Sequence, residues 1–188
     1  MVHNLKSIDL SNTYMDDGAF RFLVRNSPGL EELVLSQCPR VTDEGIAGIC
    51  SFMAPRVKVL KMAACFAVSK DGFRKGLSEL ALRATNLKYL DISSNSGNID
   101  HEIMLEFATL RNTKAQAEIF DCNDKSKPTQ TKKKLVVDIT GDGWEFTKDE
   151  VDSIELRDLT LKLIHNAKMA NHSEEGVKEY LEYLMSAY

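Results

Sequence analysis

The sequence predicts an α/β fold built from stacked strand–turn–helix repeats, and three observations support this prediction. A nine-residue pattern, L-x-x-L-x-L-x-x-C in its best copy, recurs from Leu5, Leu30, Val57 and Leu87, and more weakly from Lys114. Its starts are 25, 27, 30 and 27 residues apart, and a period of about 20 to 50 residues is the signature of a repeat architecture. Positions four and six alternate with more polar ones, as in a half-buried strand, and a helical spacing of apolar residues follows each strand.

The strand of each repeat is expected to direct the side chains at positions four and six into the core, because successive strand side chains point to opposite faces. These expected core residues are Ile8 and Leu10, Leu33 and Leu35, Leu60 and Met62, and Leu90 and Ile92.

An amphipathic helix is predicted after each of the first three strands. In the second repeat Thr42 is the predicted N-cap, and Ile46, Ile49 and Cys50 form the inward stripe. The third repeat repeats this pattern with Phe73, Leu77 and Leu80 as its stripe.

Position nine is predicted to form a buried ladder where the chain leaves each strand. Its occupants are Thr13, Cys38, Cys65, Asn95 and Cys122. Small or hydrogen-bonding side chains there can fill the interior and satisfy the backbone groups of the turn. The four cysteines contain no CxxC pair, so a structural role in a reducing compartment is expected rather than zinc binding or a disulfide framework.

The stretch LEELVLSQCPRVTDEGIAGI resembles the cysteine-containing subclass of leucine-rich repeats. That subclass is familiar from F-box substrate receptors of ubiquitin ligases and from small mitochondrial proteins similar to ATP synthase subunit s. The resemblance covers about residues 4–123 and implies a right-handed, curved solenoid with a parallel sheet on the concave face and helices on the convex face. It implies no particular partner, and neither an F-box nor a presequence is found before the first repeat.

Three segments are predicted along the chain: leucine-rich repeats over 1–123, a polar basic linker or loop over 124–134, and a last strand with a helical C-terminal cap over 135–188. The last strand is expected over 135–139. A capping box at Thr147-x-x-Glu150 is expected to open a helix with apolar residues reaching Ile164, and Ser173 is expected to start a second helix. This helical pair is interpreted as a cap on the solenoid, or alternatively as a hairpin that binds a partner or dimerises.

Two features leave alternatives open. The strand that begins at Leu5 has an apparently bare edge, so either the chain is a fragment of a longer protein or another chain covers that edge. The stretch from Asp138 to Asp149 resembles a calcium loop of the EF-hand type, but a Gly-containing strand-to-helix turn explains the same letters.

Composition argues against several classes of function. The net charge is −4 and the sequence pI about 5.6, which makes nucleic acid an improbable partner because phosphate binding usually needs a basic surface. No apolar run approaches the ~18 residues of a transmembrane helix. The sequence contains no GxGxxG, P-loop, GxSxG or HExxH motif, so we expect no enzyme, cofactor, metal or small-molecule ligand.

We therefore expect a non-catalytic protein–protein interaction module, an adaptor or substrate receptor, that binds a protein partner through the concave face. The alternative is a structural subunit or assembly factor of a larger complex, in mitochondria or elsewhere in the cell. The compartment is expected to be intracellular, either cytoplasmic or mitochondrial. The expected partner-binding residues, which alternate with the core positions, are Glu32, Val34, Val59, Lys61, Tyr89, Asp91, Gln116, Glu118 and Phe120. Acidic residues outnumber Lys61 there, so a basic or mixed partner is expected, with Tyr89 and Phe120 as anchors.

Overall fold

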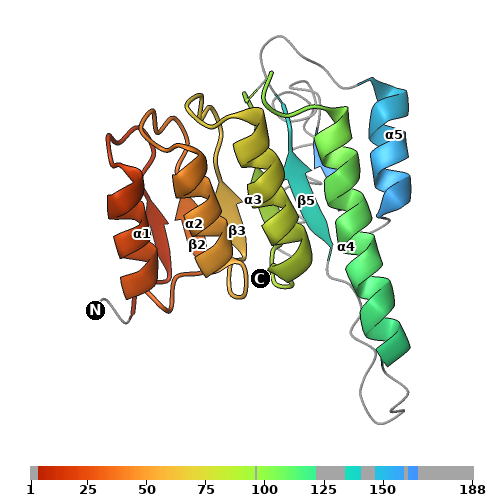
Figure 1. The fold of residues 1–188 in the computed structure, drawn as a ribbon, viewed down its shortest axis with the longest axis horizontal. Helices are drawn as coiled ribbons and strands as arrows, with labels where there is room; N and C mark the ends of the chain where they lie inside the picture. Colours follow the sequence, from red (N-terminus) through yellow and green to blue (C-terminus); the bar gives the residue numbers. More distant parts are fainter. Residues whose placement is uncertain (1–3, 96, 122–133, 141–146, 159–160, 165–188) are drawn as a thin grey trace, which may run out of the picture.

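A parallel sheet covered on one side by helices forms the protein (Figure 1). The computed structural model describes residues 4–95, 97–121, 134–140, 147–158 and 161–164, without the side chains of 114–121 and 164. Its six strands run in sequence order across one sheet. In chain order the elements are β1 (Ser7–Asp9), α1 (Asp17–Asn26), β2 (Glu32–Val34), α2 (Asp43–Met53), β3 (Val59–Lys61), α3 (Lys70–Arg83), β4 (Tyr89–Asp91), α4 (His101–Asp121), β5 (Leu135–Asp138), α5 (Lys148–Arg157) and β6 (Leu161–Ile164).

The sheet register reproduces the sequence repeat. Position four of the first four repeats aligns strand by strand, so that Ile8 pairs with Leu33, Leu33 with Leu60 and Leu60 with Leu90. Apart from Ile8 and Leu10 on the edge strand, the predicted core residues of these four repeats are buried. The helical stripes of α2 and α3 are buried as well. The core is thus one continuous layer between sheet and helices.

The expected fifth strand over 114–122 is wrong. Residues 101–121 form one long helix, α4, and the fifth strand is β5, which pairs with β4 in parallel. No Gly or Pro interrupts 101–121, so nothing local ends the helix before the degenerate copy of the pattern. β5 instead falls where the sequence predicted the last strand, over 135–139.

The predicted helix between Thr147 and Ile164 is correct only in its first part. The capping box at Thr147 and Glu150 is present, but α5 ends at Arg157 and the chain then forms β6. Leu161 and Leu163 are both buried with the exposed Lys162 between them, which is the period of two of a strand. The chain therefore adds a sixth strand where a continuous helix was expected, and the second helix predicted from Ser173 lies outside the described residues.

Neighbouring helices are joined at their N-terminal ends by a carboxylate from the preceding repeat. Oδ1 of Asp17 accepts a hydrogen bond from the backbone N–H of Thr42 at 2.9 Å, and Oδ2 accepts one from the Thr42 hydroxyl at 2.6 Å. Asp43 contacts Ser69 in the same way. Thr42 is the N-cap of α2, but its hydroxyl is committed to Asp17 rather than to its own helix.

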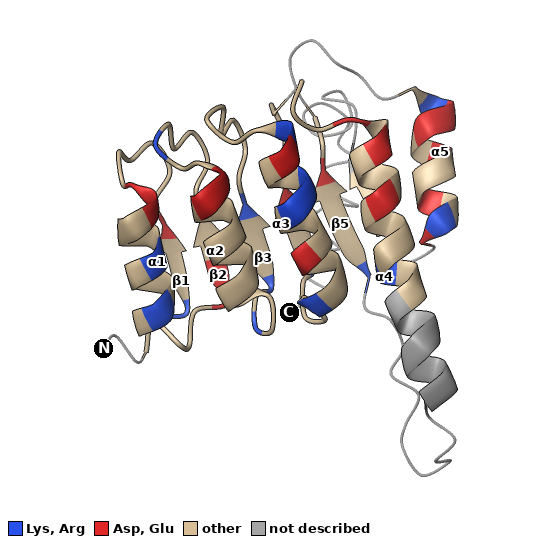
Figure 2. Cartoon of the chain, in the orientation of Figure 1, with Lys and Arg blue, Asp and Glu red and all other residues tan. Residues whose placement is uncertain are grey.

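The glycine at the third position of α2 and α3 makes room for this carboxylate. A Cβ atom on Gly45 would lie 2.1 Å from Oδ1 of Asp17, and one on Gly72 would lie 2.2 Å from Oδ1 of Asp43. The sequence Thr42-Asp43-Glu44-Gly45 therefore starts helix α2 and also allows its contact with the preceding repeat. Figure 2 shows the acidic residues gathered at these ends of α1, α2 and α3.

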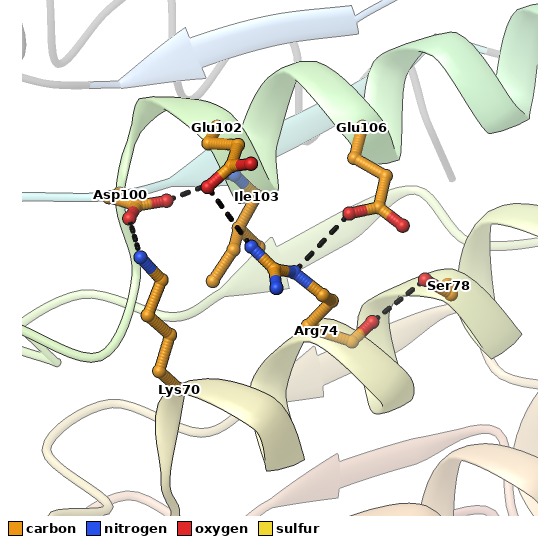
Figure 3. Close-up of polar contacts among 7 residues, drawn as sticks. All are labelled: Lys70, Arg74, Ser78, Asp100, Glu102, Ile103 and Glu106. Carbon is orange, nitrogen blue, oxygen red and sulfur yellow. Dashed lines mark hydrogen bonds and ion pairs between the residues drawn. The ribbon is translucent and has the colours of Figure 1, made fainter.

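The junction between α3 and α4 uses ion pairs instead (Figure 3). Lys70 stands where the earlier repeats have Asp, and it pairs with Asp100. Arg74 extends from α3 to two glutamates of α4, at 3.1 Å from Glu102 and 3.4 Å from Glu106. No carboxylate from α3 needs space at this junction, and Ile103 occupies the α4 position that corresponds to Gly72.

The predicted ladder at position nine is present in the first four repeats. The thiol of Cys38 donates to the carbonyl of Leu10 at 3.2 Å, and the thiol of Cys65 donates to the carbonyl of Leu35 at 3.3 Å. The side-chain amide of Asn95 takes the place of the thiol in the fourth repeat and donates to the carbonyls of Met62 and Ile92. Burial raises the pKa of the Cys65 thiol to about 11, so this thiol stays protonated and remains a donor at neutral pH.

The residue before each ladder position has a left-handed backbone. φ is 60° at Asn12 and Gln37, 53° at Ala64 and 55° at Ser94. This turn carries the chain out of the strand and aims the ladder residue inward. None of the four is a glycine, so the fold accepts a local backbone penalty in every repeat.

Candidate functional site

The face of the sheet opposite the helices carries two columns of side chains in register. The first column consists of Ser7, Glu32, Val59, Tyr89, Val136 and Lys162. The second consists of Asp9, Val34, Lys61, Asp91 and Asp138, and the backbone of residue 164 continues its register on β6. Strand spacing of about 4.8 Å sets the distance between neighbouring members of a column. We name these two columns the concave face.

Six of the nine predicted partner-binding residues lie together on this face, on the adjacent strands β2, β3 and β4. They are Glu32, Val34, Val59, Lys61, Tyr89 and Asp91. The other three, Gln116, Glu118 and Phe120, belong to helix α4 and are absent from the sheet.

Val136 and Asp138 occupy the places in the columns that Gln116 and Glu118 were predicted to fill. The signal that could have found them was the short β-branched run from Leu135 to Ile139, which the sequence already marks as a strand. Aligning that run, rather than 114–122, with the fourth repeat gives the observed register.

Exposure is uneven along the concave face. Asp9 is exposed and the side chains of Glu32, Val34, Val59, Lys61 and Asp91 are half-buried, whereas Tyr89 is only 6% exposed and Val136 only 5%. The Tyr89 hydroxyl donates to Oδ2 of Asp138 at 3.3 Å, and Nζ of Lys61 lies 5.4 Å from the Tyr89 ring centroid. Neighbouring side chains therefore cover most of Tyr89, and its role as an anchor for a partner stays a prediction.

The aspartates of the second column also hold the ends of their own strands. Asp9 accepts from the N–H of Ser11 at 2.8 Å, and Asp91 accepts from the N–H of Ser93 at 3.1 Å and from its hydroxyl at 2.6 Å. Hydrogen bonds from Ser11 hold the pKa of Asp9 below its ordinary value. The exposed end of the concave face thus presents an ionised carboxylate at neutral pH.

Burial acts in the opposite direction on Asp138. Desolvation raises the pKa of its carboxyl group, and the nearby charge of Asp91 raises it further, although hydrogen bonds from Thr140 and Tyr89 oppose both effects. Asp138 and Asp91 are neighbours in register. The two carboxylates therefore repel each other across adjacent strands.

One histidine–serine contact joins two helices of the other face. Nε2 of His101 lies 2.8 Å from the hydroxyl of Ser153, and that hydroxyl donates to the carbonyl of Glu150 at 2.8 Å. His101 begins α4 and Ser153 lies in α5, so the contact is explained as packing between these helices. Among the residues that the structure describes, no group of three or more His, Cys, Asp or Glu side chains is placed to hold a metal ion.

Within the described part of the chain, no helix combines the length and the apolar character that crossing a bilayer requires.

Comparison with known proteins agrees with this geometry. A family profile described as "Leucine Rich repeat" matches residues 26–50, which include β2 and the first part of α2. Among solved structures, the tropomodulin C-terminal domain from Caenorhabditis elegans superposes with a TM-score of 0.55 at 12% sequence identity, and the match covers 82% of each chain. The repeat period, the parallel sheet and these two matches together show that the chain has the α/β leucine-rich-repeat solenoid fold.

Proposed function

We propose that this chain is a non-catalytic protein-interaction module that binds a partner protein through the concave face. Leucine-rich-repeat solenoids commonly bind other proteins along the extended surface that their repeated units create. The observation that carries the proposal is the register of β1 to β4, which places Glu32, Val34, Val59, Lys61 and Asp91 on one continuous surface. An adaptor or substrate-receptor role within the cysteine-containing subclass, inside the cell, fits the ladder thiols of Cys38 and Cys65.

The charge of this surface favours a basic or mixed partner. Asp9, Glu32 and Asp91 surround the single cation Lys61 on strands β1 to β4. Two residues further along the chain from the second column, the seventh repeat position carries the small residues Ser11, Ser36, Ala63 and Ser93, which let a partner backbone approach closely. Val34 and Val59 supply apolar area between the charges.

Charge reversal on the concave face tests the proposal. Asp9→Lys combined with Glu32→Lys should weaken capture of the partner by about tenfold or more, because like charges across an interface are strongly unfavourable. The matched control is Glu79→Lys with Asp152→Lys, which makes the same change in net charge on helices α3 and α5. The measurement is quantitative affinity purification with the wild type and both variants, at matched thermal stability.

A protein captured equally by the wild type and the concave variant would rule out the concave face as its binding site. Equal loss with both variants would mean that net charge, rather than this surface, controls capture. Loss with the concave variant alone supports the proposal.

A further inference from the structure

A second exposed surface lies at the edge of the sheet where the strands end and the chain turns toward the helices. In the first three repeats the residue after the ladder position is exposed there: Tyr14 is 73% exposed, Phe66 is 72% exposed, and Pro39 between them is exposed as well. The three are equivalent positions of successive repeats, so they form a row, which we name the loop ridge. Large apolar side chains exposed in a row mark interaction sites more often than isolated ones do.

The surroundings of the loop ridge are acidic. Asp16, Glu44 and Asp71 are exposed at the N-terminal ends of α1, α2 and α3, two to five residues after the ridge residue of the same repeat. Figure 2 shows acidic residues at these helix ends. The side chain of Glu44 is 78% exposed to solvent although it forms an ion pair with Arg21 at 3.5 Å. The nearby cation Lys70 is already paired with Asp100, so the exposed carboxylates of Asp16, Glu44 and Asp71 outnumber the exposed cation of the ridge, Arg40.

One ridge residue already binds a cation of its own chain. The guanidinium carbon of Arg40 lies 5.7 Å from the centroid of the Tyr14 ring, within the ~6 Å at which a cation is attracted to an aromatic face. Arg40 comes from the loop of the second repeat and Tyr14 from that of the first. The ridge therefore has the geometry that holds a guanidinium against an aromatic ring.

We propose that the loop ridge binds a short, extended, Lys- or Arg-bearing segment of a partner protein, with apolar side chains that pack on Tyr14, Pro39 and Phe66. Tyr14 and Phe66 are two repeats apart, about 10 Å at the strand spacing, which an extended chain spans in about three residues. The exposed acids at the helix ends supply charge complementarity to the segment. This site is separate from the concave face and does not depend on it.

Selection from a displayed library of random short peptides tests this proposal. The wild-type protein should enrich peptides that combine Lys or Arg with apolar residues. Tyr14→Ser with Phe66→Ser should weaken a synthetic enriched peptide about tenfold or more in a direct titration, because exposed aromatics of this kind act as binding anchors. Glu44→Lys with Asp71→Lys should weaken it and flatten its salt dependence.

The matched control is Phe22→Ser, because Phe22 is 70% exposed but lies on helix α1. Failure to enrich any basic peptide, or equal weakening by the Phe22 and ridge variants, would overturn the proposal. Sedimentation velocity tests whether the loop ridge binds a second copy of this chain instead. A concentration-dependent dimer that only the ridge variant abolishes would show this and overturn the proposal.

Discussion

The ion pair between Arg111 and Asp158 is expected to decide whether the last repeat stays docked. Nε of Arg111 lies 3.0 Å from Oδ2 of Asp158, and their side chains are only 9% and 1% exposed. Arg111 belongs to α4, and Asp158 is the C-cap of α5, between that helix and β6. Replacing Asp158 by Ala would leave the guanidinium buried without this carboxylate, which costs about 3 to 5 kcal/mol.

The contrast with an exposed pair sharpens the prediction. Glu79 and Arg83 lie 3.1 Å apart on one helix with side chains 44% and 46% exposed, and such pairs contribute only about 0.3 to 0.5 kcal/mol. Glu79→Ala is therefore the matched control for Asp158→Ala. The double replacement Arg111→Met with Asp158→Leu should recover most of the loss, because it removes both buried charges at once.

Urea unfolding, followed together with hydrogen exchange of the β6 and α5 amides, is the appropriate assay. In a solenoid each repeat contacts mainly its neighbours, so a loss of this size should first open the terminal unit and only then the rest. The amides of Val151 and Leu163 should therefore exchange faster in Asp158→Ala, with β2 and β3 unchanged. A loss of stability no larger than that of Glu79→Ala would refute the reasoning.

Three further predictions concern the repeat contacts and the buried carboxyl group. Gly72→Ala should lower the free energy of unfolding by about 2 kcal/mol in a urea titration, because the added Cβ displaces the Asp43 carboxylate. In an Asp43→Ala background the same replacement should be neutral or stabilising. A loss of equal size in that background would contradict the prediction. Ala64→Gly should stabilise the fold by about 0.5 to 1 kcal/mol, because glycine adopts the left-handed backbone at this position without steric strain. The control Ala63→Gly should destabilise the fold by a similar amount. Equal effects of the two replacements would show that the positive φ of Ala64 is not the cause. Asp138→Asn should stabilise the protein increasingly as pH rises above the ordinary carboxyl pKa of 3.8, and by a constant amount above the raised pKa of the folded state. The raised pKa means that the folded state binds the Asp138 proton more tightly than the unfolded state, so wild-type stability falls as pH rises through this window. A pH-independent difference in thermal melting between Asp138→Asn and the wild type would contradict the last prediction.

The placement of the candidate site could be predicted only in part. Glu32, Val34 and Lys61 follow from the repeat register alone, because strands with a period of two and a fixed repeat must align their outward positions. The burial of Tyr89 could not be predicted in this way, since the exposure of a side chain depends on distant residues that pack beside it.

The error in the fifth repeat has a related cause. The sequence over 114–122 matches the pattern weakly, and its apolar residues are equally compatible with the end of a helix. Whether residues 114–122 form a helix or a strand depends on which segment pairs best with β4. β4 pairs with β5, whose Leu135, Val136 and Val137 are all buried and bring more apolar surface than Ala117 and Ile119 offer.

The sequence by itself determined the repeat period, the core columns, the capping residues and the ladder of Thr13, Cys38, Cys65 and Asn95. Each of these depends on contacts that recur at a fixed spacing, so the pattern of one repeat predicts its neighbour. Only the tertiary structure decided which segments form the fifth and sixth strands, and which concave residues are covered. It also showed that Gly45 and Gly72 leave space for a carboxylate from the preceding repeat, which lies beside each of them. These features arise between residues far apart in the chain, where local propensity has no influence and packing selects the outcome.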